Sequence, residues 1–322
     1  MKKIFIFILL LNLTLICGCQ PKMNLFPDGT DPLLEKTLQG EGSDKVLVIS
    51  VDGTIADEGK RGLLGSAPSL VQEVTSRLKL AAEDKDIKAL VLKVNSPGGS
   101  VTASDILYNE ILRFKEKTEA KVVVCMMDVA ASGGYYISLP ADKIMAHPTT
   151  LTGSVGVLFV RPKIEGLMDK IGVSVEVSKS GRNKDMGFPF KPDTDEQKQI
   201  INDIIKNYAK RFQALVKKHR SISGPKLKKI FTAQVFSAQG AKDAGLVDTL
   251  GYLPDAVETA CKLAGITSDS KVITYKRKSY PNDTLYNSAS SQTFNPALIN
   301  IDTGNLLPPS AGFHYLWLPA VH

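Results

Sequence analysis

The sequence predicts an α/β protein with a largely parallel sheet, and three observations lead to this expectation. Short runs rich in aliphatic and β-branched residues, at 46–51, 87–94 and 121–127, have the composition of buried strands. The segments 70–82 and 100–117 between these runs have apolar residues at helical spacing. Strands that alternate with helices of this length are typical of right-handed crossovers between parallel strands.

Further elements are expected along the rest of the chain. The longest helix is predicted over residues 194–218, where Thr194 and Gln197 have the spacing of a capping box and an apolar stripe follows. We expect that stripe to face the core or another subunit. Shorter helices are predicted at 237–244 and 254–263, and short strands at 143–146, 173–177 and 272–275.

The composition excludes several classes of protein. The chain has 322 residues, of which 43% are hydrophobic and 23% charged, enough for one or two domains with sizeable cores. It lacks the run of about 20 apolar residues that each span of a polytopic membrane protein needs. The net charge of +7 is spread along the chain, with a short basic cluster at 217–220. A nucleic-acid-binding protein concentrates its basic charge on one face, so we expect no nucleic-acid partner.

The N-terminal segment is expected to direct the chain out of the cytoplasm. Lys2 and Lys3 precede a mainly apolar stretch at 4–16, which is too short for a membrane-spanning helix and suits a secretory signal. The sequence that follows it resembles a bacterial lipobox, with Gly18 before the cut and Cys19 as the residue to be lipidated. We therefore expect a lipoprotein anchored to a membrane of the cell envelope. An uncleaved signal anchor is the alternative.

The division of the chain follows from its changes in composition. Residues 1–18 form the signal, and residues 19–44, with several Pro and Gly, form a flexible tether. Residues 45–268 form the main domain, and residues 269–322 form a Ser/Pro-rich tail. The tail ends in an apolar stretch at 313–319, which we expect to dock against the protein.

The two cysteines that remain after signal cleavage are expected to be free thiols. Cys125 lies inside a predicted buried strand, where free Cys is common, and Cys261 lies in a predicted helix. No set of Cys and His residues has the spacing of metal ligands, so neither a structural disulfide nor a metal site is expected.

The first candidate for chemistry is Ser132. It follows the strand predicted at 121–127 and a stretch of small residues, and it precedes Gly133 at the start of a predicted helix. A turn from strand to helix can expose a nucleophilic hydroxyl, and the Gly133 N–H could face the same way. The alternative is an ordinary helix N-cap, for which Ser is also preferred.

The second candidate is the segment 95–100, which contains Gly98 and Gly99 after another predicted strand. Two glycines let the backbone approach a ligand closely and direct N–H groups at developing negative charge, as in an oxyanion hole. A tight turn before a helix is the alternative. Both candidate segments follow the carboxyl ends of predicted parallel strands, where such sheets place their sites.

A nucleophilic serine needs a base, and the chain has only 4 His residues. Lysine can serve instead where burial lowers its pKa from about 10.4 toward 7–8. Lys184, in a Gly-containing loop after the strand predicted at 173–177, is the candidate. The alternative is an ordinary surface lysine.

Four motifs together resemble the signal peptide peptidase A family, membrane-associated serine proteases of the Clp/crotonase superfamily. They are NSPGGSV at 95–101, DVAASGGYYI at 128–137, LTGSVGV at 151–157 and SKSGRNKDMG at 178–187, and AKDAGLVD at 241–248 is similar to the family's closing segment. The resemblance covers about residues 45–265, in the family's order, and corresponds to its short, single-unit members.

This resemblance implies a fold, a reaction and an assembly. The fold is a Clp/crotonase-like repeated ββα spiral, with Ser132 as the nucleophile and Lys184 as the general base of a Ser/Lys dyad. Ser154 matches the serine that orients the lysine, and Gly98, Gly99 and Gly133 match the oxyanion region. The implied protein is a homo-oligomeric ring that cleaves apolar peptides, including remnant signal peptides, through an acyl-enzyme. No cofactor or metal is implied.

Three alternatives and one further hypothesis remain open at this stage. The base could be His147, as in a Clp-like Ser/His protease. The chain could be a non-catalytic crotonase-like binding lipoprotein, or a crotonase acting on acyl-CoA, although secretion separates it from the CoA pool. The apolar end of the tail could occupy the substrate groove of its own or a neighbouring subunit.

Overall fold

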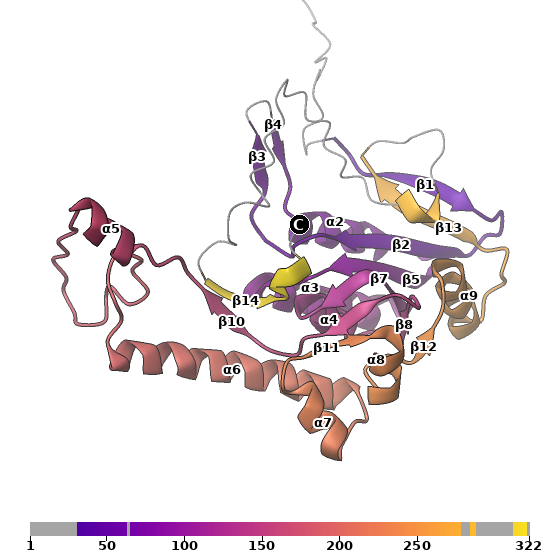
Figure 1. The fold of residues 1–322 in the computed structure, drawn as a ribbon. Coiled ribbons are helices and arrows are strands. Elements are labelled where there is room, and N and C mark those ends of the chain that lie inside the picture. Colours follow the sequence, from indigo (N-terminus) through magenta and orange to yellow (C-terminus); the bar gives the residue numbers. More distant parts are fainter. Residues whose placement is uncertain (1–30, 63–64, 278–283, 288–311, 321–322) are drawn as a thin grey trace, which may run out of the picture.

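The computed structural model describes residues 31–62, 65–277, 284–287 and 312–320. The predicted signal and Cys19 lie outside the described residues, as does most of the predicted tail. The parts described form a layered body around a central sheet, with a separate projection on one side (Figure 1).

The strands are short except for the three at the centre of the main sheet. They are β1 (Leu34–Gln39), β2 (Lys45–Asp52), β3 (Lys60–Gly62), β4 (Gly65–Ala67), β5 (Ile87–Ser96), β6 (Gly98–Ser100), β7 (Lys121–Ala131), β8 (Lys143–Ala146), β9 (Leu151–Gly153), β10 (Leu158–Val160), β11 (Val235–Ser237), β12 (Thr249–Leu250), β13 (Lys271–Lys276) and β14 (Gly312–Leu316).

The helices include the long one predicted near the middle of the chain. They are α2 (Leu70–Ala81), α3 (Val101–Thr118), α4 (Gly133–Ser138), α5 (Glu165–Ile171), α6 (Asp195–His219), α7 (Gly224–Ile230), α8 (Ala238–Ala244) and α9 (Leu253–Ala264), with the 3₁₀ turns η1 (Leu285–Asn287) and η3 (Leu318–Ala320). The capping box of Thr194 and Gln197 that begins α6 is present as predicted.

The main sheet is largely parallel, so the predicted fold class is confirmed. Its strands follow the order β1-β13-β2-β5-β7-β8-β12, and β9 pairs with the end of β7. The pairs along the path from β13 to β12 are parallel, whereas β1 on β13 and β11 on β9 are antiparallel. Each parallel step requires the chain to cross over the sheet, and α2 and α3 make two of these crossovers.

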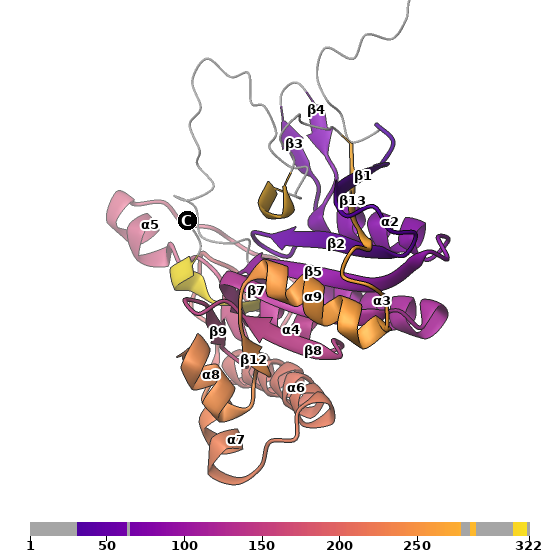
Figure 2. The same cartoon turned by 90° about the vertical axis from the view of Figure 1, so that its right-hand side faces the viewer.

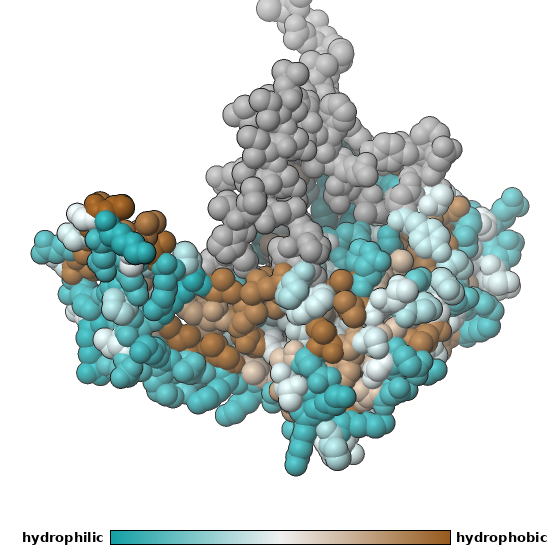
Figure 3. Space-filling view, in the orientation of Figure 1, coloured by the Kyte–Doolittle hydropathy of each residue, from teal (hydrophilic) through white to brown (hydrophobic). Residues whose placement is uncertain are grey.

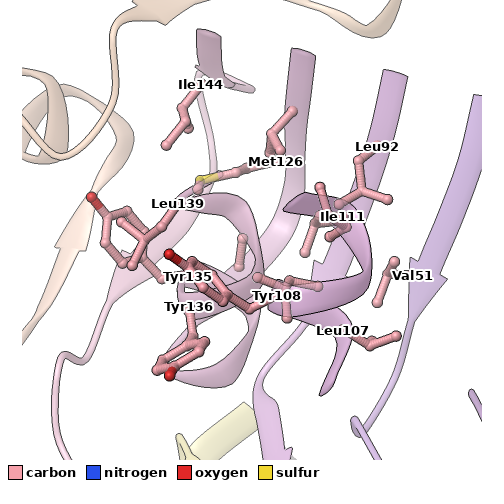
Figure 4. Close-up of a cluster of buried hydrophobic side chains, with 14 of the residues drawn as sticks. Val51, Leu92, Leu107, Tyr108, Ile111, Met126, Tyr135, Tyr136, Leu139 and Ile144 are labelled. Carbon is pink, nitrogen blue, oxygen red and sulfur yellow. The ribbon is translucent and has the colours of Figure 1, made fainter. Parts of the chain in front are cut away.

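Helices cover both faces of the sheet and bury its alternating side chains. On one face α2, α3 and α4 pack on residues such as Leu92 of β5 and Met126 of β7, and Figure 4 shows Leu107 and Ile111 of α3 among them. On the other face α9 packs on Val91 and its neighbours (Figure 2). Because both faces are buried, the central strands are apolar throughout, which is why the sequence identified them.

Residues 161–203, here called the arm, extend away from the body (Figure 1). The arm contains α5, an irregular loop and the first part of α6. The strand predicted at 173–177 is wrong, because these residues form no strand with the described part of the chain. Val173, Val175 and Val177 are 49%, 47% and 39% exposed, so their alternation reflects neither a paired strand nor a buried face within this chain.

The main sheet reaches beyond the limits expected for the main domain. β1 lies within the segment expected to be a tether, and β13 lies within the segment expected to be a tail. These two strands pair with each other, and β13 also pairs with β2 in parallel. The ends of the sheet therefore do not coincide with the boundaries placed at residues 44 and 268.

Two further findings concern the expected anchoring and thiol chemistry. No helix among the described residues is both long and apolar enough to cross a membrane. Cys125 and Cys261 are buried free thiols. Burial raises the pKa of Cys125 to about 12, so this thiol stays protonated and is a poor nucleophile.

Candidate active site

Ser132 occupies a sharp turn between β7 and α4. Its backbone has φ 52° and ψ −112°, a conformation that is strained for a residue with a side chain. The turn is held from both sides, because the Ser132 N–H donates to the Gly153 carbonyl at 2.8 Å and the Ser132 carbonyl accepts from Tyr136 N–H at 2.8 Å. Ser132 is 1% exposed, and its hydroxyl makes no hydrogen bond with the described residues. Such a turn presents a serine side chain for nucleophilic attack.

Ser154 lies beside Ser132 because of the pairing of β7 with β9. Ala131 is opposite Gly153 in a parallel register, so the residues that follow the two strands are neighbours. Ser154 is 8% exposed and also has a positive φ of 52°. Two non-glycine residues with strained backbones at the end of the same strand pair make this point of the sheet a candidate functional site.

Gly98 and Gly133 bring two backbone segments into close contact next to Ser132. Gly98 has φ +102°, and a Cβ built on it would lie 2.6 Å from Gly133 N. A Cβ on Gly133 would lie 3.0 Å from the Gly98 Cα. Gly99 packs against the backbone of Ile55. A Cβ built on Gly99 would overlap the Ile55 carbonyl. The glycines predicted around an oxyanion hole are therefore brought together with the predicted nucleophile.

The C-terminal strand β14 lies on the edge of β6, directly at these glycines. It forms the middle of a three-stranded antiparallel sheet with β10 on its other side. Trp317 N–H extends the pairing by donating to the Pro97 carbonyl at 2.8 Å. Docking of the apolar tail end against the body is thus confirmed. Figure 3 shows apolar surface over β10 and β14, in the concave stretch between the arm and the body.

A hydrogen-bonded network that the sequence did not indicate holds Tyr136, four residues after Ser132. The Tyr136 hydroxyl donates to Asp105 Oδ1 at 2.6 Å, and Arg211 donates to the same oxygen at 2.7 Å from Nη2. Burial and the Asp105 carboxylate raise the pKa of Tyr136, which stays protonated. These residues come from α4, α3 and α6, and nothing in their spacing along the chain predicts the contact.

Lys184 is not next to Ser132 in the single chain. It lies in the loop between α5 and α6, which is part of the arm, and its side chain is exposed. Figure 1 shows that loop well apart from α4 and the end of β7. The loop is ordered by Asp185, whose carboxylate accepts from Lys179 Nζ at 2.9 Å and from Lys191 Nζ at 3.0 Å. The hydrogen bond from Lys179, with that from Lys191, lowers the pKa of Asp185 against the opposing effect of burial.

His147, the alternative base, is also away from Ser132. Its N–H donates to the Met126 carbonyl at 2.9 Å, six residues before Ser132 along β7. Between Met126 and Ala130 the strand is irregular, because four residues of β7 span the length of two residues of β5. At about 3.3 Å per residue the two positions are therefore separated by roughly 13 Å along the sheet. The His147 ring is 2.8 Å from Thr149 Oγ1 and meets the ring of Tyr252 edge-on. This geometry disfavours a Ser132–His147 pair within one chain.

Comparison with known proteins agrees with the class of fold described above. Residues 66–152 match the family model for Clp protease, which confirms the Clp/crotonase-like fold. Among solved structures, the chain is similar to a point mutant of ClpP1 from Listeria monocytogenes, with a TM-score of 0.42 and 18% identity over 65% of this chain and 93% of that one. The match to the Clp protease model and the strained turn at Ser132 thus indicate the class of serine peptidases with a Clp-like fold.

The family follows from three further matches. Residues 114–267 match the family model for peptidase family S49. The chain is 35% identical to a protein of Enterococcus faecium named as a signal peptide peptidase, SppA, over 77% of this chain and 72% of that one. It is also 37% identical to Protease 4 of Salmonella typhi, over 68% of this chain and 34% of that longer protein. The chain therefore belongs to peptidase family S49, and it is a serine peptidase.

Proposed function

We propose that this chain is an endopeptidase that cleaves apolar peptides, such as remnants of signal peptides, with Ser132 as nucleophile and Lys184 as general base. The proposal rests on the strained turn at Ser132. At this turn the buried serine lies next to the closely packed backbone segments of Gly98 and Gly133. A peptide carbonyl held there meets both the hydroxyl that attacks it and backbone N–H groups that stabilise the resulting oxyanion.

The edge of β6 supports binding of the substrate as an extended strand. β6 already forms backbone pairs with one strand, β14, along this edge. A peptide bound in the same way gains main-chain hydrogen bonds that do not depend on its side chains, while its apolar side chains contact the apolar surface over β10. This mode of binding suits unfolded apolar segments and excludes folded proteins.

The proton path requires a lysine amine at Ser132. In the first step the Ser132 Oγ attacks the substrate carbonyl and its proton passes to the Lys184 amine; the lysine then gives the proton to the leaving amine as the peptide bond breaks. Water attacks the acyl-enzyme in the second step, and Lys184 again takes and returns the proton. We assign Ser154 the role of orienting Lys184, since it lies beside Ser132 and is nearly buried.

We propose that Lys184 serves Ser132 of a neighbouring copy in a homo-oligomeric ring. The arm keeps its loop away from Ser132 of its own chain. It also exposes apolar side chains that another copy can cover, among them Leu167 and Ile171, which are 61% and 63% exposed. A head-to-tail contact of this kind, repeated until it closes, produces a ring in which each site takes residues from two subunits.

We further propose that the mature protein is a lipoprotein held at the membrane by a lipid on Cys19, with its catalytic domain outside the cytoplasm. The support is the lipobox-like sequence that ends at Cys19 and the apolar stretch before it. Cleaved signal peptides remain in the same membrane, so an anchored peptidase encounters them directly.

Labelling with a fluorophosphonate probe tests the dyad. The wild-type protein should react at Ser132, and Ser132→Ala and Lys184→Ala should both lose labelling. Lys170→Ala is the matched control, because Lys170 is another exposed lysine of the arm. Labelling lost only in Ser132→Ala would remove Lys184 from the mechanism. A wild-type protein that does not label would favour a non-catalytic binding protein.

Mixing two inactive variants tests whether the site is shared between copies. Ser132→Ala supplies an intact lysine and Lys184→Ala an intact serine, so random mixing in a head-to-tail ring restores about one half of one half, or about a quarter, of the sites. Activity recovered on mixing therefore supports a shared site. Failure to recover it, with both single variants inactive, would mean that Lys184 reaches the Ser132 of its own chain.

A further inference from the structure

The net positive charge of the chain comes from one segment. Residues 204–242 contain ten Lys and Arg residues and no Asp or Glu, which gives this segment a formal charge of +10. The rest of the chain has 30 Lys and Arg residues and 33 Asp and Glu residues, a formal charge of −3. The positive charge is therefore more localised than the short cluster at 217–220 alone indicates.

The two arginines of this segment are paired within the chain, whereas most of its lysines are not. Arg211 binds Asp105, and Arg220 binds Asp248. Exposed lysines lie at the end of α6, along α7 and in α8, and none of them forms an ion pair with a carboxylate of the described residues. These lysines, here called the basic face, are Lys217, Lys218, Lys226, Lys228, Lys229 and Lys242.

The fold brings the three helices of the basic face together. Lys226 Nζ donates to the Asp243 carbonyl at 2.6 Å, which joins α7 to α8. The Lys217 ammonium lies 5.6 Å from the centroid of the Phe231 ring, which joins the end of α6 to the end of α7. Figures 1 and 2 both show α7 and α8 at the end of the molecule opposite β3 and β4. The lysines therefore form one surface, although they are spread over 26 residues of sequence.

The positive charge at this end acts on a neighbouring group of the protein. His219, the last residue of α6, has its pKa lowered first by burial and then by the charges of Lys218, Lys115 and Arg220. Asp243 is the acidic residue that follows the segment, and its single carboxylate offsets only one of the six ammonium groups. A surface with this excess of positive charge attracts anions from solution.

The chemistry of the basic face suits a long anion better than a membrane or a small ion. No large apolar side chain of residues 204–242 is exposed, so the face lacks the groups that insert a peripheral helix into a bilayer. Its lysines are spread over three helices, and one small anion contacts only a few of them. Lysine binds phosphate as a point charge without a fixed geometry, which suits a chain of repeated charges.

The basic face also lies away from the proposed lipid anchor. The described chain begins at Asp31 and leads into β1, at the end of the molecule that carries β3 and β4 (Figure 1). Cys19 lies 12 residues before Asp31, and 12 extended residues reach at most about 40 Å. An anchor there keeps the membrane near β3 and β4. The basic face at the opposite end is then directed toward material farther from the membrane.

We propose that the basic face binds a linear polyanion with phosphate groups in its repeat, a polymer of the cell envelope. A polymer that contacts several lysines releases the counterions condensed along it, so its affinity is the sum of many weak contacts and falls steeply with salt. The proposed location outside the cytoplasm favours an envelope polymer over nucleic acid. Such binding would retain the peptidase where the polymer is dense, and it uses no group of the candidate active site.

Binding of long-chain inorganic polyphosphate to the full chain tests the basic face. The wild-type protein should bind at low salt, and log Kd should rise linearly with log salt concentration, by about 0.7 per contacted phosphate. Lys218→Gln, Lys228→Gln and Lys242→Gln together should weaken binding at least about tenfold and lower this slope by about 2. These three side chains form no hydrogen bond, ion pair or ring contact with the described residues, so the substitutions leave the fold intact.

A second triple variant controls for the overall charge. Lys36→Gln, Lys79→Gln and Lys85→Gln change the net charge by the same amount, on β1, on α2 and just after α2. This control should bind polyphosphate within about twofold of the wild type. Equal weakening in both triple variants would overturn the basic face, as would a wild-type protein that does not bind. Labelling of Ser132 should be the same in all three proteins, so the result does not depend on the proposed function.

Vesicles distinguish a polymer from a membrane surface. The ratio of binding to phosphatidylglycerol vesicles over phosphatidylcholine vesicles cancels the contribution of any lipid anchor. This ratio should be smaller than the effect of the three substitutions on polyphosphate binding, because the basic face has no apolar side chain to insert. A larger ratio that the same substitutions abolish would assign the basic face to an anionic membrane and overturn the proposal.

Discussion

Substitution of Gly98 by alanine provides a direct test of the carbonyl-binding position. The added methyl group is small, but Gly98 has φ +102°, and a Cβ there would overlap the carbonyl oxygen of Tyr315 and lie 2.6 Å from Gly133 N. A substrate strand bound in the place of β14 would bring its own carbonyl to the same point. Gly98→Ala should therefore displace the reacting carbonyl from the N–H groups beside it.

The expected effects distinguish a loss of folding stability, caused by the backbone conformation, from a loss of catalytic rate. A left-handed conformation costs an alanine about 1–2 kcal/mol, and this cost falls on folding stability. Gly53 is the matched control, because it has φ +81° and a Cβ there would meet nothing within 4 Å. Gly53→Ala should show only the stability cost. Gly98→Ala should in addition lower kcat by about 10²–10³, the effect of losing one oxyanion donor.

The assay measures kcat and KM for a blocked peptide 4-nitroanilide, with thermal unfolding of each variant recorded in parallel. Gly53→Ala should lower Tm by a few degrees, since about 1 kcal/mol moves the Tm of a domain of this size by roughly 2–4 °C. Gly98→Ala should lower Tm further, because its Cβ would overlap backbone atoms of Tyr315 and Gly133. Only Gly98→Ala should lose activity when measured well below its Tm. A kcat for Gly98→Ala within about twofold of the Gly53→Ala value would refute the assignment of Gly98 to the reacting carbonyl.

Two further predictions concern stability and the arm. Burial alone raises the pKa of Asp248, but hydrogen bonds from Arg220 and Ile144 N–H and the charge of Arg220 outweigh it and hold the pKa below its usual value of about 3.9. This stabilisation is complete above pH 3.9 and is lost as the pH falls through the lower folded pKa. The gap in Tm between wild type and Asp248→Asn, set by hydrogen bonds worth about 1–3 kcal/mol, should narrow as the pH falls below about 3.9, and a constant gap would contradict this. Asp185→Asn should lower kcat about tenfold or more with little change in Tm, because Asp185 orders the loop that carries Lys184. Asp203→Asn, an exposed carboxylate of α6 bonded to Gln199 and Lys206, should change neither, and equal kcat values for the two variants would contradict the role of Asp185.

Most of the body could be predicted from the sequence because its elements are defined by local patterns. β2, β5 and β7 are buried on both faces, so their apolar runs identify them directly. α6 begins at a capping box and has an apolar stripe, and both are local signals. The strand expected at 173–177 is absent from the described residues. Alternating valines predict a strand only where another strand is available to pair with it.

The candidate site also contains parts that could be predicted from the sequence and parts that could not. Ser132 and the glycines at 98, 99 and 133 follow strand ends in the sequence, and parallel pairing brings such ends to one edge of the sheet. The position of β14 could not be predicted, since its partner β6 is more than 200 residues away and its five residues contain no signal for that edge. The contact of Tyr136 with Asp105 and Arg211 likewise joins three helices that are distant in sequence.

By itself, the sequence determined the α/β class, the central strands, the nucleophile candidate and the resemblance to a protease family, because each depends on a short pattern of residue types. Only the tertiary structure decided that Lys184 lies on an arm apart from Ser132, and that the C-terminal strand pairs with β6 at Gly98 and Gly99. These relations arise when distant segments pack together, and packing depends on the shape of the whole chain, which no local window of sequence contains.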